Sequence, residues 1–471
     1  MIPKQKTNYE EPAGTRRASF GNETPAARWG RRSARLRGPS RRSLFPYAQT
    51  NRSLFIWSTV LPLLLLVLCL ATAPAAAQVN LGAGLDVEYR MGGDESRFLV
   101  NEIPSPEDVP QSGSPEPHFA IRQVNLFAFS QISESFFFEG RLQMDNIGSG
   151  GLNPPRVGLA YLGWEPQGAP VTVSVGRFVN PFGQYPKQSL AFRNDFVAAP
   201  LLYGYGVNVT QGLGYRPGAQ ASTRGYFGWD KALSTLYRTG YVTGAKGSWT
   251  IAENTLVWDL AVVNNAPTSR KSISGAGNAA LITRLEVRPA LFWTQGLSFS
   301  HGSFMDQHPQ NRPLRQNESL RRFRQTLIGT DFQTGYRYFA LGGELAYTIW
   351  SVPGYREDAM PPYQDGAFVR DGQGTLARFR LTQWGGHVDA KFEPPFLPGS
   401  YLAVRGAHLY FPKRDHPVTA EPFKWDADVT RLSAVVGYKL HPRILTKVSF
   451  TQQTPFDGSR YSLRFQITSM F

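Results

Sequence analysis

Apolar and polar side chains alternate along many short segments of this chain, and Gly, Pro, Asn and Asp separate these segments. The clearest alternating runs lie at residues 81–90, 136–145, 281–288, 431–439 and 461–468. A period of two places one set of side chains on each face of a β-strand, and the separating residues are those that form turns. The pattern therefore predicts an all-β chain.

The length of these segments bears on where the sheet lies. They are strand-like over about 9–11 residues, the length that a tilted strand needs to cross a bilayer. Tyr, Trp and Phe recur near their ends, which is typical of the aromatic girdles of membrane barrels. A soluble sandwich also alternates, so a secreted all-β binding protein stays open. The pattern favours a transmembrane antiparallel β-barrel.

The number of strands follows from the length of the barrel region, residues 78–471. A spanning strand with its connection takes roughly 20–25 residues, which predicts roughly 16–18 strands. Barrels of about this size leave an aqueous channel. Long connections without a helical period are expected at residues 91–118, 180–233, 302–323, 351–374 and 411–427.

An export signal precedes the barrel region. Residues 54–77 are apolar and end in Ala75-Ala76-Ala77 before a polar Gln78, as the hydrophobic and cleavage regions of a signal peptide do. An uncleaved anchor helix is the competing interpretation. Residues 1–53 form a basic extension, either a long positively charged start of the signal or a stretch upstream of the true start. The single cysteine, Cys69, lies inside the signal.

The net charge of +15 at first suggests a nucleic-acid-binding protein. However, residues 1–53 hold twelve Lys and Arg against three Glu, so the rest of the chain carries only +6. The basic excess therefore belongs mainly to the targeting region, and we expect no nucleic-acid partner.

If the apolar set of each strand faces lipid, the other set lines the channel. Twelve basic and nine acidic residues then point inward or lie at the rims. This excess suggests a mild preference for anions; in the alternative, the charges pair off and merely solvate a wide pore. The basic candidates for lining the pore are Arg141, Arg284, Arg288, Arg378, Arg380, Arg431 and Lys447.

Residues 175–187 read VGRFVNPFGQYPK and contain the most distinctive local pattern. Asn-Pro and Phe-Gly break the strand and begin a long loop. If that loop folds back into the barrel, Lys187 and Arg193 lie near a constriction. The alternative is an ordinary extracellular loop.

The VGRFVNPFG segment follows FFFEGRLQMDN and AYLGWEP, and the chain ends in Phe471. Over about 60 residues this ensemble resembles the phosphate-selective porin O and P family. The resemblance implies a channel-forming barrel, often a homotrimer, that passes small anions such as phosphate. The terminal Phe471 closes an alternating strand and resembles the signal that the barrel-assembly machinery reads.

We therefore expect a passive porin for small hydrophilic solutes in the outer membrane of a Gram-negative bacterium. The sequence has no nucleophile elbow, phosphate-binding loop or paired-His motif, so we expect no enzyme activity, cofactor or metal. A substrate-specific outer-membrane transporter is the second hypothesis, and an outer-membrane enzyme is a weaker third.

Overall fold

The computed structural model of the chain describes eleven stretches of sequence. They are residues 79–92, 118–145, 154–212, 214–215, 232–237, 240–252, 255–269, 278–305, 318–354, 368–454 and 460–471. The basic extension at 1–53 and the signal at 54–77 lie outside them, so both stay predictions.

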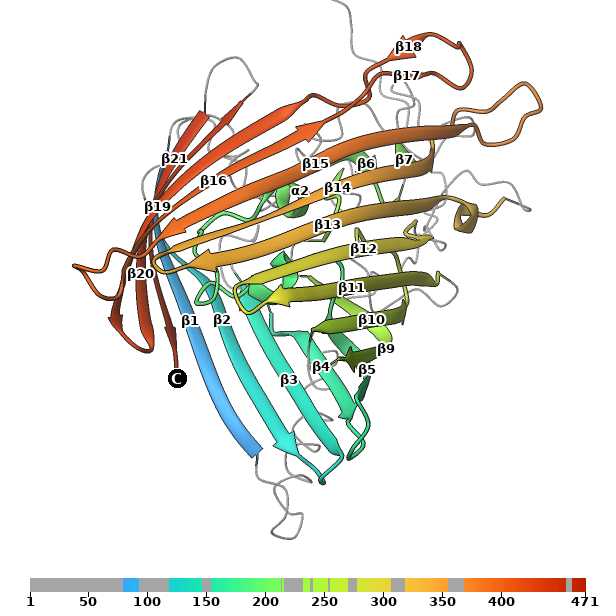
Figure 1. Cartoon of the computed structure of the whole chain (residues 1–471). Helices are drawn as coiled ribbons and strands as arrows, with labels where there is room; N and C mark the ends of the chain where they lie inside the picture. The colour runs from blue at the N-terminus through green and yellow to red at the C-terminus, as the bar shows by residue number, and fades with distance from the viewer. Residues whose placement is uncertain are drawn as a thin grey trace, which may run out of the picture. The chain divides into compact units, whose positions relative to one another are not determined.

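Sixteen antiparallel strands close into one barrel, which confirms the predicted fold class and strand number (Figure 1). Those of the first half are β1 (Val79–Gly92), β2 (His118–Gln131), β3 (Phe136–Asp145), β4 (Arg156–Trp164), β5 (Val171–Val179), β9 (Tyr241–Ile251), β10 (Leu256–Val263) and β11 (Ala280–Ala290). Those of the second half are β12 (Trp293–Ser303), β13 (Arg324–Tyr336), β14 (Phe339–Pro353), β15 (Arg378–Phe392), β16 (Ser400–Tyr410), β19 (Val429–His441), β20 (Ile444–Thr454) and β21 (Arg460–Met470).

The barrel closes where its first and last strands pair. β1 pairs with β21 over nine residues of each strand, from Gly84–Met470 to Gly92–Ser462. Beyond this ladder, the Phe471 N–H donates to the Ala83 carbonyl at 2.8 Å, and the Ala83 N–H donates back at 3.3 Å. Because lipid offers no partners to backbone groups, closure of this seam is what allows the sheet to span a membrane.

The two ends of the barrel differ in the length of their connections. At one end the turns are short: residues 132–135 join β2 to β3, and Leu291 and Phe292 join β11 to β12. Phe471 lies at this end, beside the start of β1. The long connections lie at the other end, as between β5 and β9. Short turns are typical of the periplasmic side, so we refer to the short-turn end as the periplasmic end.

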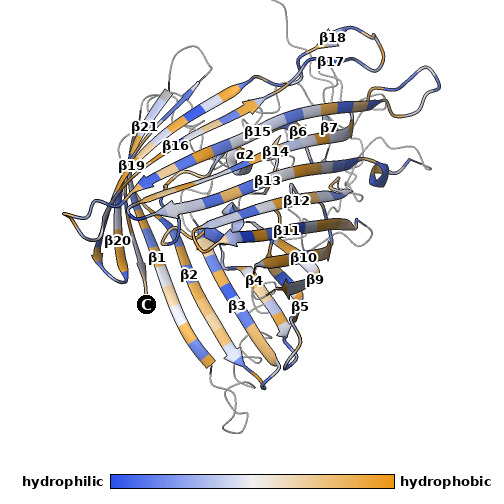
Figure 2. Ribbon diagram, viewed as in Figure 1, coloured by the Kyte–Doolittle hydropathy of each residue, from blue (hydrophilic) through white to orange (hydrophobic). Residues whose placement is uncertain are grey.

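The outer face of the barrel is apolar and exposed, and its inner face is polar and buried. Leu345 and Val436, on the outward face, are 49% and 54% exposed, whereas the inward Asp331 and Arg431 are 2% and 1% exposed. The alternation is visible along each strand in Figure 2. A soluble sandwich places its apolar face inside, so this distribution favours a barrel surrounded by lipid.

Several short elements lie in the connections. They are the 3₁₀ helices η3 (Tyr185–Gln188) and η5 (Leu320–Arg322), the helix α2 (Leu201–Gly204), and the strands β6 (Val207–Thr210), β7 (Gly214–Tyr215), β8 (Ala232–Leu233), β17 (Arg414–Asp415) and β18 (Pro422–Phe423). β7, β6 and β8 form a small sheet, and β17 and β18 form a hairpin. Within the described stretches, no helix is long and apolar enough to cross a membrane.

The outward position of Val436 can be tested by substitution. Val436 lies mid-strand in β19, and an arginine on the lipid face near the bilayer midplane costs about 2–4 kcal/mol of folding free energy. We therefore expect Val436→Arg to lower the free energy of unfolding in lipid vesicles by that amount. Val436→Leu, which keeps the face apolar, is the control. An unchanged unfolding midpoint for Val436→Arg would mean that this face is in contact with water.

Candidate functional site

The chain after β5 folds back into the barrel rather than extending away from it. Residues 180–212 lie along the inner faces of β12 to β16, β19 and β20, through bonds described below. Helix α2 packs on β15 and β16 (Figure 1). A Cβ at Gly385 would lie 2.7 Å from Leu202 Cδ2, so the glycine leaves room for that side chain. Of the two predicted interpretations, the inward-folding loop is the one observed, and we call residues 180–212 the inserted segment.

Apolar packing inside the barrel holds part of this segment. Leu201 and Leu202 are at most 1% exposed. They belong to a buried apolar cluster that includes inward side chains of the wall, namely Trp350, Leu381 and Leu409. Apolar packing against the wall therefore fills this part of the barrel interior and holds the inserted segment in place.

The Asn-Pro-Phe-Gly sequence makes the turn that starts the inserted segment. The Phe182 N–H donates to Asn180 Oδ1 at 3.0 Å, the local bond that asparagine commonly forms in turns. Gly183 has φ +73°, a conformation that glycine adopts without strain. A Cβ there would also lie 2.8 Å from the Tyr203 hydroxyl and 3.0 Å from Glu344 Oε1. Glycine is thus required by both conformation and space.

The carboxylate of Glu344, on β14, binds the inserted segment at three points. Its Oε1 accepts the backbone N–H groups of Gln184 and Tyr185, each at 2.5 Å, and its Oε2 accepts the Tyr203 hydroxyl at 2.8 Å. Burial, and next the neighbouring carboxylate, raise the pKa of Tyr203, so the phenol keeps the proton that it donates. Charge-assisted bonds of this kind are stronger than neutral ones, and they fix the segment against the wall.

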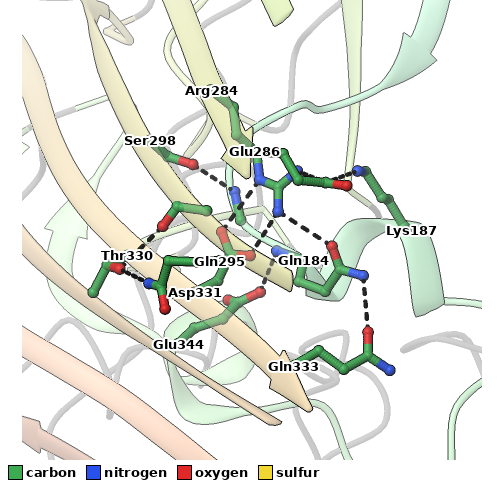
Figure 3. Close-up of polar contacts among 12 residues, drawn as sticks. Gln184, Lys187, Arg284, Glu286, Gln295, Ser298, Thr330, Asp331, Gln333 and Glu344 are labelled. Carbon is green, nitrogen blue, oxygen red and sulfur yellow. Dashed lines mark hydrogen bonds and ion pairs between the residues drawn. The ribbon is translucent and has the colours of Figure 1, made fainter. Parts of the chain in front are cut away.

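Next to Glu344, Arg284 is enclosed by acceptors (Figure 3). Its Nη2 lies 2.6 Å from Asp331 Oδ1, its Nη1 bonds Glu286, and its Nη2 also reaches Gln184 Oε1 at 3.3 Å. A Cβ at Gly296 would lie 2.3 Å from Asp331 Oδ2, so that glycine leaves space for the pair. Arg284 faces inward as predicted, but its charge is compensated by acidic neighbours.

Lys187 of the inserted segment joins the same cluster. Its Nζ lies 3.0 Å from Glu286 Oε2, and Arg288, near the periplasmic end of β11, lies 2.7 Å from Glu286 Oε1. Arg193 is on the inserted segment too, and its side chain is exposed. The two predicted constriction residues therefore both lie on the inserted segment with exposed side chains, and Lys187 is also paired with Glu286.

Four basic side chains from the wall bind backbone carbonyl groups of the inserted segment. Arg405 donates to Ala198 O at 3.0 Å, Arg431 to Ala199 O at 3.1 Å, and Arg122 to Val197 O at 2.9 Å. Lys447 donates to Ala191 O at 2.5 Å and to Asn194 O at 2.7 Å.

These contacts change the interpretation of Arg431 and Lys447. Both point inward, as predicted, but they are 1% and 2% exposed. Because their side chains hold the inserted segment, they are buried beneath it rather than presented to the channel. We call the set of Arg122, Arg405, Arg431 and Lys447 the carbonyl anchors.

On β3, Arg141 occupies a different environment. Its guanidinium carbon lies 4.8 Å from the ring centre of Tyr241, and that of Arg177 lies 5.9 Å from the same centre. Arg141 Nη2 donates to the neutral Gln143 at 2.9 Å. Among the described residues, Arg141 forms no ion pair and its Nε–H has no partner.

A small polar cavity separates Arg141 from the inserted segment. Its volume is about 40 Å³, enough for a few water molecules or one anionic group. It is lined by polar side chains of both the wall and the segment, including Arg122, Arg141, Gln143, Asp145, Ser189 and Asn194. An incompletely satisfied guanidinium beside such a cavity is suited to bind an anion.

Arg378 and Arg380 correct the prediction that they line the channel. On β15 both are exposed, whereas Phe379 between them and Leu381 after them are buried. Phe379 packs on Tyr215, with ring centres 5.3 Å apart. Tyr215, in the connection between β5 and β9, offers Phe379 an apolar partner inside the barrel. The apolar side chains at this end of β15 therefore point inward, and the two arginines point outward.

Sequence reasoning missed Arg122 and Arg405. Arg405 alternates with the outward Leu402 and Val404 in a regular strand. The alternation of apolar and polar residues in β16 could therefore have predicted that Arg405 points inward. Arg122 lies where the register between β1 and β2 shifts, beside Gln123. A bulge of this kind interrupts alternation, and the sequence gives no sign of it.

No family model and no curated protein matches the chain. An anion-selective porin from Comamonas acidovorans superposes with a TM-score of 0.51 and 8% identity, covering 84% of this chain and 100% of that one. A loop L8 deletion mutant of OmpT, an outer membrane protein of Vibrio cholerae, gives 0.50 and 8%, also covering 84% and 100%. At these identities the likeness shows the fold, that of barrels of the Gram-negative outer membrane. The resemblance to the phosphate-selective family stays a prediction.

Substitution of Gly183 tests whether the position of the inserted segment limits the conductance of the channel. A Cβ there meets Tyr203 and Glu344, and a non-glycine residue with this φ costs about 1–3 kcal/mol. We expect Gly183→Ala to loosen the inserted segment and raise single-channel conductance in planar bilayers.

Gly168 offers a matched control for this experiment. It has φ +72°, close to that of Gly183, but a Cβ there would meet nothing within 4 Å. Gly168→Ala should leave conductance as in the native protein. An equal conductance change in both variants would show that backbone strain, and not contact with Glu344, governs the effect.

Proposed function

We propose that this protein is a passive outer-membrane porin that admits small hydrophilic solutes and favours anions. The barrel has the fold of known porins and an apolar outer face. The inserted segment narrows its lumen, as a size-selective channel requires. The observation that carries the anion preference is the unpaired Arg141 beside a polar cavity.

The pairing of the other inward charges supports this preference. Of the inward carboxylates, Asp145 pairs with Arg156 and Asp389 with Arg405, whereas Asp86 and Glu139 form no ion pair among the described residues. Within the described stretches, neither Arg141 nor Lys246 forms an ion pair; Lys246 Nζ lies 5.8 Å from the Phe178 ring centre. Arg141 and Lys246 contribute a positive field inside the barrel, which the nearby carboxylates Asp86, Glu139 and Asp259 reduce but do not cancel by pairing.

Phosphate as the natural solute, and assembly as a homotrimer, are further parts of the proposal. Both come from the resemblance to the phosphate-selective family, which residues 136–187 carry. Asp145, which lines the same cavity as Arg141, opposes a doubly charged anion, so we place monovalent anions first.

Selectivity is tested by reversal potentials across a potassium chloride gradient. The native channel is expected to prefer chloride over potassium. Arg141→Gln and Arg193→Gln each remove an inward positive charge and should lower the chloride-to-potassium permeability ratio by about twofold or more.

Arg378→Gln is the matched control because the same charge is removed from the outer face. It should leave the permeability ratio unchanged. A native channel that prefers potassium, or equal effects of Arg141→Gln and Arg378→Gln, would contradict the proposal.

We also propose that Phe471 is the residue the barrel-assembly machinery reads. Its backbone extends the closing seam, and its side chain is exposed, so it is available to a partner before closure. Deleting Phe471 should lower the amount of folded, heat-modifiable barrel in outer membranes, while the barrels that do form keep native conductance. Normal assembly of the shortened chain would overturn this role.

A further inference from the structure

Four aromatic side chains line the inner wall of β2, β3 and β4 near the periplasmic end. They are Phe127, Phe129, Phe137 and Tyr161, which we call the aromatic strip. Register fixes their facing: Phe127 pairs with the inward Arg141, and both Phe129 and Tyr161 pair with Glu139. Phe137 precedes Glu139 by two residues on β3 and therefore shares its face.

Three of these rings, those of Phe129, Phe137 and Tyr161, form a continuous surface. The ring centres of Phe129 and Phe137 are 6.2 Å apart, and those of Phe137 and Tyr161 are 6.0 Å apart at an interplanar angle of 83°. The Phe137 ring occupies the place of a side chain at Gly163, where a Cβ would lie 2.1 Å from its Cζ. Phe129 is 38% exposed.

Core packing accounts for only one member of the strip, Tyr161, which packs against the larger buried apolar cluster. Among the described residues, Phe127, Phe129 and Phe137 belong to neither of the buried apolar clusters. The interior of a wide membrane barrel is ordinarily polar, and aromatic rings left in contact with water there are unfavourable. A solute with an apolar surface would relieve that contact during passage.

Arg141 follows the aromatic strip along β3. It lies four residues from Phe137, about 13 Å along the strand, with Glu139 between them. The Glu139 carboxylate accepts the Tyr161 hydroxyl at 2.6 Å. Glu139 also acts on Arg141, so its negative charge weakens the binding of an anionic group there and allows the group to leave.

We propose that the preferred solutes are small aromatic carboxylates, an inference that rests on the proposed porin function. The carboxylate binds Arg141 and Gln143, and the ring passes over Tyr161, Phe137 and Phe129. An inorganic anion has no apolar surface to contact the aromatic strip, and a neutral aromatic molecule has no charge to pair with Arg141. The two features together select molecules that carry both groups.

The test compares benzoate with acetate under bi-ionic conditions in planar bilayers. Benzoate is the larger anion, so a pore that selects by charge and size alone passes it more slowly than acetate. The native protein should give a benzoate-to-acetate permeability ratio above one. Benzyl alcohol, which has the ring without the charge, should not block the chloride current at the same concentration.

Two variants test the strip itself. The double variant Phe129→Ala/Phe137→Ala should lower the ratio about three- to tenfold, the effect expected from losing aromatic contacts. Phe137→Leu keeps apolar volume without the ring and should lower it partly, which keeps the test valid if the double variant folds poorly. Phe136→Ala is the matched control, because Phe136 comes directly before Phe137 in β3 and its side chain faces outward.

The outcomes separate this inference from the porin proposal. A native channel that prefers chloride over potassium but gives a ratio below one overturns the inference alone. A ratio unchanged in Phe129→Ala/Phe137→Ala, or lowered equally in Phe136→Ala, also overturns it. A native protein that does not conduct, or that prefers potassium, refutes the porin proposal itself and the inference with it.

Discussion

Backbone N–H and C=O groups shielded from water must find partners, and this constraint acts twice in this barrel. In the wall it is met by the closed ladder of sixteen strands, with Phe471 and Ala83 completing the seam. Inside, the inserted segment lacks a neighbouring strand along residues 191–199. Its carbonyl groups are satisfied by Arg405, Arg431 and the other carbonyl anchors, so the lumen can hold an irregular chain.

This arrangement divides the inward charges by role. Arg284 and Glu344 hold the turn at the start of the inserted segment, and the carbonyl anchors hold its later part. Apart from the half-buried Arg122, both sets are buried, and their polar groups are largely satisfied. Arg141, by contrast, retains an unsatisfied donor beside a cavity. The number of basic residues facing inward therefore overstates the charge that a solute meets, because most of these residues stabilise the inserted segment.

The fold could be predicted from alternation because the outer face of a membrane barrel must be apolar along its whole height. The facing of Arg284, Arg431 and Lys447 followed from that rule. The rule was wrong for Arg378 and Arg380, because Phe379 and Leu381 point inward and pack in the buried apolar cluster that includes Tyr215. Which cations would be anchors and which would be exposed depends on where residues 180–212 lie, a tertiary property that local periodicity does not contain.

The carbonyl anchors have a consequence for how this channel can diversify. Their hydrogen bonds go to backbone carbonyl oxygens, which every amino acid has. These bonds therefore do not depend on the identity of the side chain at each position. Arg193 is the exposed position between Ala191 and Ala199, and its side chain can be exchanged while Lys447 keeps its bonds to the carbonyl groups on either side. A point mutation there would change the charge that a solute meets and leave the attachment of the inserted segment in place.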